Sequence, residues 1–136
     1  MTSEESLRIR SYLTAQGAKL SPEQLIGRVQ EAMAKLREAA NAVPQARFAE
    51  PPAPGEPRDV AARDTTPRAL SQWWAMLERD RGVLFERVRS ADPTARLDAT
   101  IAHPFFGPLN WRETLLFIRL HDLDHAGQLA KVAGLA

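Results

Sequence analysis

Residues 110–132 of the chain read NWRETLLFIRLHDLDHAGQLAKV, and this stretch predicts one long helix. Asn110 suits the N-cap position, and Glu113 follows at the spacing that completes a capping box. At about 100° per residue, large apolar side chains fall within one arc of the helix, together with both histidines of the stretch. This histidine arc consists of Trp111, Leu115, Ile118, His121, His125, Leu129 and Val132.

The two histidines of the arc are a candidate metal site. His121 and His125 are one helical turn apart, so their rings point in the same direction and can occupy neighbouring positions around one metal ion. Asp122 lies in the same arc on the side away from His121, and we expect it to orient a ring nitrogen. Asp124 points away. The spacing alone also fits two hydrogen-bonded core histidines.

Three further helices are expected before this one. The first covers about 3–16, with Gly17 as its stop. The second covers about 21–42, because Ser21, Pro22 and Gln24 form a strong helix start before a continuous apolar stripe. The third runs from about 66 to 91. No segment combines a sustained period of two with β-branched residues, so we expect an all-α bundle without a sheet.

A proline-rich connection at about 44–65 separates the second and third predicted helices. It contains five prolines and a glycine, which exclude a long helix. A connection of this length without regular structure is uncommon inside a compact domain. The chain of 136 residues is otherwise the size of one domain, and we expect residues 1–136 to form one.

Composition excludes several classes of function. The chain has no cysteine, which excludes disulfides, thiolate metal sites and cysteine nucleophiles. A net charge of +1 gives no reason to expect binding to nucleic acid or to an acidic membrane. No apolar run approaches the roughly 20 residues that cross a bilayer, and the first residues do not resemble a secretion signal. We therefore expect a cytoplasmic protein.

The third histidine, His103, precedes the last helix in the sequence HPFFGP. His121 lies roughly 16 Å along the helix axis from Asn110, so the short loop would have to be almost fully extended to bring His103 to the pair. His103 is therefore a strained candidate ligand. We favour a role in fixing the loop, with Phe105 and Phe106 closing the end of the bundle.

The residues HPFFGPLNWRE at 103–113, followed by HDLDH at 121–125 and by Gln128, resemble the C-terminal motif of the DinB/YfiT-like superfamily. The stretch from Ser21 to the Pro-Gly-Glu at 54–56 is similar to the first helix of that family and the loop after it. The resemblance covers most of the chain. It implies an up-down helical bundle that holds a divalent metal through three histidines, and we expect this metal to be zinc or nickel.

Two of the histidines that the resemblance implies match His121 and His125. The third belongs to the second helix of the family, where this chain has its proline-rich connection. Residues 57–63 resemble the start of that helix, with Arg63 near the expected histidine, and a guanidinium does not ligate a metal. Water, Asp59 or a group from a partner chain would then complete the shell. Some relatives are thiol-dependent transferases or isomerases, which implies a small thiol as one candidate substrate.

A bundle that lacks one long helix leaves apolar surface uncovered. Leu116, Leu120, Leu123 and Ala130 form a second apolar stripe, roughly opposite the histidine arc. We therefore expect a homodimer. Two functions are open: a metal-binding protein with metal-assisted, transferase-like activity, or a degenerate, non-catalytic dimeric structural module without metal. Whether the chain is an enzyme stays undecided by the sequence.

Overall fold

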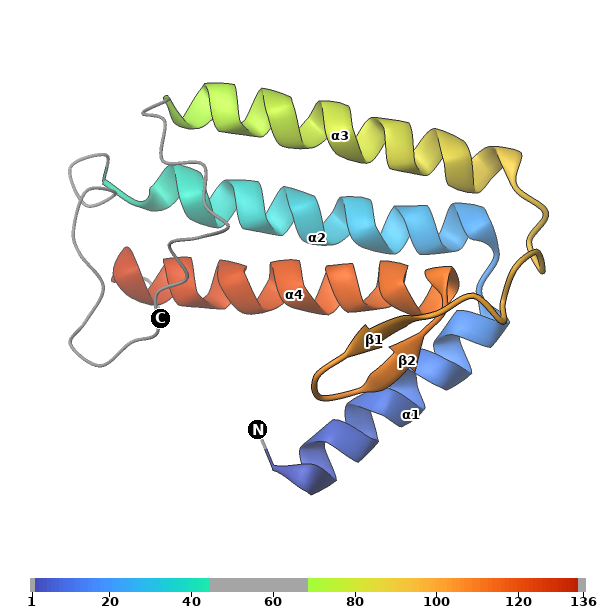
Figure 1. The fold of residues 1–136 in the computed structure, drawn as a ribbon. Helices are drawn as coiled ribbons and strands as arrows, with labels where there is room; N and C mark the ends of the chain where they lie inside the picture. The colour runs from blue at the N-terminus through green and yellow to red at the C-terminus, as the bar shows by residue number, and fades with distance from the viewer. Residues whose placement is uncertain (1, 45–68, 135–136) are drawn as a thin grey trace.

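The computed structural model describes residues 2–44 and 69–134 of the chain (Figure 1). In chain order it contains α1 (Ser3–Lys19), α2 (Pro22–Ala42), α3 (Leu70–Ser90), β1 (Ile101–His103), β2 (Gly107–Leu109) and α4 (Trp111–Val132). The predominantly helical fold expected from the sequence is confirmed. The described residues do not include the proline-rich connection after Pro44. Asp59 and Arg63 therefore lie outside them.

The helix starts that the sequence predicts with capping boxes are confirmed. The Ser21 hydroxyl accepts a hydrogen bond from the backbone N–H of Gln24, at 3.1 Å, at the start of α2. The Asn110 side chain accepts one from the backbone N–H of Glu113, at 2.9 Å, at the start of α4. The predicted start of the third helix, at 66–67, is outside the described residues; α3 is helical from Leu70 and ends at Ser90 as expected.

The prediction that Gly17 stops the first helix is wrong, because α1 continues to Lys19. Gly17 is instead buried where α1 crosses α4. A Cβ atom at this position would lie 3.2 Å from Cγ of Glu113, which is closer than most packed Cβ atoms. The glycine therefore permits a close approach between two helices, and its position in the sequence does not mark a helix end.

The prediction that the chain contains no sheet is also wrong. β1 and β2 form a short antiparallel hairpin, with Ile101 paired to Leu109 and His103 paired to Gly107. Each strand has three residues, which is too short for an alternating pattern to be recognised. Gly107 adopts a φ of +72°, which residues with a side chain rarely adopt.

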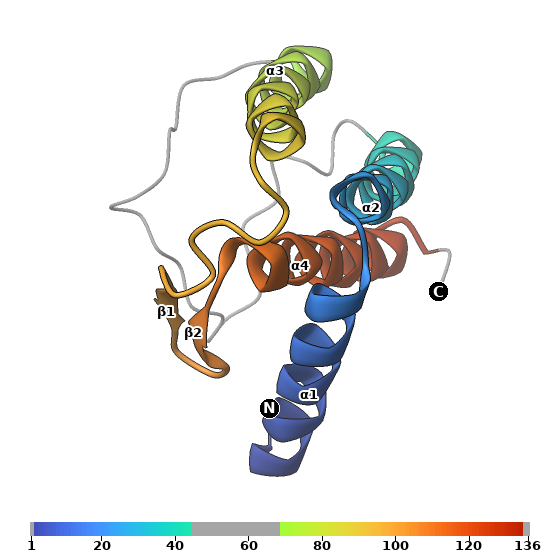
Figure 2. The ribbon, with the colours of Figure 1, turned by 90° about the vertical axis from the view of Figure 1, so that its right-hand side faces the viewer.

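The helices enclose one hydrophobic core. α2 and α4 lie side by side, and α3 runs antiparallel to both (Figure 1), while α1 crosses the beginning of α4 (Figure 2). The second apolar stripe of α4 contributes to this core through Leu116, which is fully buried in one cluster with Leu25, Ile26 and Val29 of α2. The expectation that this stripe stays uncovered is therefore wrong at Leu116, because α2 of the same chain packs against it.

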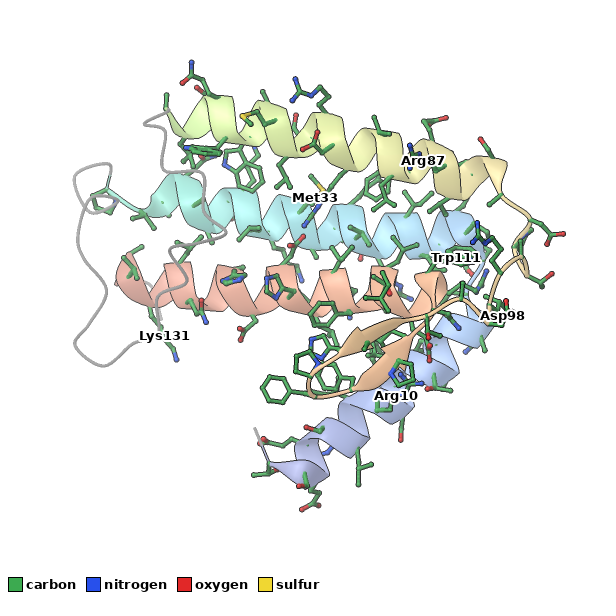
Figure 3. All side chains as sticks on the ribbon, in the orientation of Figure 1. Arg10, Met33, Arg87, Asp98, Trp111 and Lys131 are labelled. Carbon is green, nitrogen blue, oxygen red and sulfur yellow. The ribbon has the colours of Figure 1, made fainter. Side chains whose placement is uncertain are left out.

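Polar contacts hold the hairpin and α3 in place. Arg10 of α1 lies beside the hairpin (Figure 3), and its guanidinium donates to the carbonyl oxygens of Phe106, at 3.1 Å, and Pro108, at 2.5 Å. Ion pairs between Arg37 and Glu78 and between Arg89 and Glu23 connect α2 with α3.

An apolar cavity of about 320 Å³ remains between α3, the hairpin region and the first half of α4. Leu84 and Val88 of α3, together with Trp111 and Ile118 of α4, contribute to its walls. It lies on the side of α4 that carries the histidine arc. Within the described parts of the chain, no helix is long and apolar enough to span a membrane.

Candidate metal centre

His121 and His125 converge on a common point, as the helical spacing predicts. Their Nε2 atoms are 3.0 Å apart. The ring centroids are separated by 4.4 Å, and the ring planes are inclined by 83°. The two nitrogen atoms that most often ligate metals therefore face one another across the surface of α4.

The separation between these nitrogen atoms fits two ligands of one ion. At zinc–nitrogen distances of about 2.0–2.1 Å, two ligands are about 2.9 Å apart at a right angle and about 3.3 Å apart at a tetrahedral angle. The observed 3.0 Å lies within this range. It also fits a hydrogen bond between the two rings, in which one Nε2 donates and the other accepts.

Gln128 orients the ring of His125. The side-chain oxygen of Gln128 lies 3.0 Å from Nδ1 of His125. Because an amide oxygen only accepts hydrogen bonds, Nδ1 carries the proton and the lone pair of Nε2 is directed at the common point. The amide nitrogen of Gln128 in turn donates to the Asp124 carboxylate at 3.4 Å. Asp124, which we expected to point away, thus supports the pair through Gln128.

Asp122 does not have the orienting role predicted for it. Asp122 is buried, with 3% of its side chain exposed, and both carboxylate oxygens accept hydrogen bonds from the guanidinium of Arg81 on α3. Helical periodicity gives the angular position of Asp122 around the axis of α4. It could not show that an arginine from another helix would bind the carboxylate.

Both histidines are exposed, although the pattern predicted that they face the core. Within the histidine arc, Leu115 is buried, Ile118 and Leu129 are half-buried, and Val132 is 39% exposed. The pKa of His121 is lowered, first because partial burial disfavours the charged ring and second because His125 is close. Asp122 and Asp124 oppose this shift. The pair is therefore a partly desolvated surface site.

His103 is held in the hairpin and is not brought to the pair. Its Nδ1 accepts a hydrogen bond from the backbone N–H of Phe105 at 3.1 Å, and its ring stacks on Phe106 with centroids 4.6 Å apart. The Phe117 ring contacts both His103 and His121. His103 thus fixes the loop, as we favoured. Phe106 is buried, whereas Phe105 is 61% exposed and does not close the bundle.

The described residues supply two ligands but not a third. Within residues 2–44 and 69–134, no group of three or more His, Asp or Glu side chains is arranged to hold a metal ion. The candidate ligand Asp59 is outside these ranges. The pair thus fits two neighbouring positions of a coordination shell, and the remaining positions are open.

Comparisons with known proteins found no match among protein-family models, curated proteins or solved structures. The DinB-like resemblance therefore stays a prediction made from the motif.

Proposed function

We propose that this protein binds a divalent metal ion, zinc or nickel, through His121 and His125. The observation that supports the proposal best is the 3.0 Å separation of their Nε2 atoms. The contact between Gln128 and His125 also supports the proposal, because a histidine that ligates a metal usually donates its other ring N–H to an oxygen acceptor. The pair also needs little reorganisation on binding, since the rings already converge.

The exposure of the pair favours chemistry on a small molecule that reaches the site from solvent. A bound divalent ion would supply Lewis-acid activation of a water or a thiol. The protein itself positions the ligands: Gln128 fixes the tautomer of His125, and α4 holds the two rings one turn apart. We propose metal-assisted, transferase-like activity on this basis, with a low-molecular-weight thiol as the candidate substrate.

Metal binding is tested by isothermal titration of zinc and nickel into protein that carries no polyhistidine tag and has been stripped with EDTA. We expect saturable binding that His125→Ala and His121→Ala abolish. Lys131→Ala, an exposed substitution on the same helix, serves as the control and should bind like the unmodified chain. Equal binding by the histidine variants and the control would show that the ion binds elsewhere.

A second function remains: a dimeric structural or interaction module that binds no metal. Its support is that the described residues supply two ligands and that Val132 of α4 and Ile101 of the hairpin are exposed. The two histidines would then share one hydrogen bond. No metal uptake, together with unchanged stability of His125→Ala, would favour this function. In both cases the cytoplasmic location and the absence of nucleic-acid and membrane partners stay predictions from composition.

A further inference from the structure

The candidate site has open coordination positions on an exposed helix face. Structural zinc sites are almost always four-coordinate and tetrahedral. Each chain offers two imidazoles whose Nε2 atoms face a common point. Because both histidines are exposed, another protein surface can reach that point. The missing half of the coordination shell therefore requires ligands that face the pair from outside α4.

The sequence around the pair has the spacing of a helix–helix contact. Positions at alternating steps of three and four residues form what we call the α4 seam: Trp111, Thr114, Ile118, His121, His125, Gln128 and Val132. Alternating steps of three and four are the spacing with which one helix packs along another. The first three members are half-buried and line the apolar cavity, whereas the last four are exposed.

The seam is also symmetric about its centre at Leu123. In an antiparallel pair of identical helices, residues at equal distances on either side of the two-fold axis face each other. An axis at this centre places His121 opposite His125 of the second copy, Ile118 opposite Gln128, and Thr114 opposite Val132. The same operation therefore brings together all four imidazoles and overlaps the helices along almost their whole length.

The cavity gives the second copy a place to pack. It lies between α3, the hairpin region and the first half of α4, and it has a volume of about 320 Å³. Ile101, at its edge, is 72% exposed. In the antiparallel arrangement the exposed end of one seam, with Val132, meets the cavity of the other copy. Because the two-fold axis repeats this contact, each copy covers the apolar surface that the other copy leaves open.

We propose that two copies of this chain pack antiparallel along the α4 seam and share one metal ion, which His121 and His125 of both copies ligate. The proposal rests on the proposed metal binding alone. Four imidazoles fill a tetrahedral shell and leave no position for a water or a thiol, so the shared ion would be structural, and the transferase-like activity would require a chain that binds the ion without a second copy. The proposal names the partner that completes the site, a second copy of the same chain. Asp124 accepts a hydrogen bond from the Gln128 amide that holds the ring of His125, so each copy would bring one carboxylate to the surroundings of the shared site.

The test is a titration of Co²⁺ into the tag-free, EDTA-stripped full chain, with the visible absorption of tetrahedral Co²⁺ and the molar mass by light scattering measured at each point. We expect saturation at one ion per two chains in a species of twice the monomer mass. His121→Ala and His125→Ala should lose the absorption. Both replace exposed helical positions with the best helix former, so circular dichroism should confirm folding. His103→Gln is the matched histidine control and should retain the shared site.

Two other outcomes would overturn the proposal in distinguishable ways. Saturation at one ion per chain, in a monomer, would show that the chain binds metal through the pair but that a second copy does not complete the site. No binding of Co²⁺ would reject both the shared site and the proposed metal-binding function.

Discussion

Arg81 on α3 binds the carboxylate of Asp122 on α4 with both of its terminal nitrogens, and its Nη2 atom lies 2.9 Å from Oδ1. The side chains are 16% and 3% exposed, respectively. The bidentate geometry satisfies both oxygens of a carboxylate that lies next to His121 in the chain. This pair therefore connects the helix that carries the candidate site to α3.

Removal of the Asp122 carboxylate should destabilise the fold. Asp122→Ala leaves the largely buried Arg81 guanidinium without its partner, and we expect a loss of about 3 kcal/mol in the free energy of unfolding. Urea unfolding followed by circular dichroism measures it. Glu78→Ala is the control, because it breaks an exposed pair with Arg37 and should cost less than about 1 kcal/mol. Equal losses in both variants would contradict a special role for the buried pair.

Arg112 should be as important for stability as Asp122. Its guanidinium is buried and donates to the carbonyl oxygens of Gly17, Leu20 and Pro93, which lie at the end of α1 and in two loops. Arg112→Met leaves these acceptors unpaired, and we expect a loss of about 2–3 kcal/mol in thermal or urea unfolding.

Arg119→Met is a matched control for the substitution at Arg112. Arg119 lies on the same helix and makes a hydrogen bond to the Tyr12 hydroxyl at 2.9 Å. We expect a loss of about 1 kcal/mol for this variant. If Arg119→Met destabilised the protein as much as Arg112→Met, the three carbonyl contacts would not explain the effect.

Gln128 should set the metal affinity of the pair. Gln128→Leu removes the acceptor for Nδ1 of His125, and we expect zinc to bind about tenfold more weakly in a calorimetric titration. Gln128→Glu keeps an oxygen acceptor and should retain the affinity or increase it. If the leucine variant bound zinc as tightly as the unmodified chain, the hydrogen bond from Nδ1 of His125 would not be needed for Nε2 to ligate the metal.

The lowered pKa of His121 should make stability depend on pH in the metal-free protein. The unfolded chain takes up a proton on this ring near pH 6.5, whereas the folded chain takes it up only at lower pH. The contribution of His121 to stability is therefore complete above about pH 6.5 and is lost as the pH falls toward the folded pKa. His121→Gln should flatten the pH dependence of urea unfolding in this window. A nuclear magnetic resonance titration that placed His121 at or above the ordinary histidine range would contradict the prediction.

The parts of the fold that follow from local chemistry were predictable. The capping boxes at Ser21 and Asn110 depend on residues three apart, and both helix starts are confirmed. The second apolar stripe of α4 was expected to supply uncovered surface for a dimer, whereas Leu116 on this stripe is fully buried against α2 of the same chain. The hairpin was missed because its strands are very short. Gly17 was misread because only the packed structure shows that Glu113 approaches it.

The candidate site was predictable in its spacing but not in its surroundings. A step of four residues on a helix was enough to predict that His121 and His125 converge. Their exposure depends on which elements cover the arc, and helical periodicity does not contain that information. The partner of Asp122 was assigned wrongly because Arg81 comes from another helix, and the partner of His125 was missed because a flexible glutamine amide at position 128 reaches its ring nitrogen.

The contacts between α1 and the beginning of α4 have a consequence for synthesis. Arg112 and Gly17 are 95 residues apart in the chain, and Thr14 and Glu113 are 99 apart. A nascent chain that emerges from the ribosome carries α1 long before its binding site on α4 exists. The apolar side of α1, including Leu13, therefore stays without its native contacts until α4 has been synthesised, and exposed apolar surface of this kind is what chaperones bind on unfinished proteins.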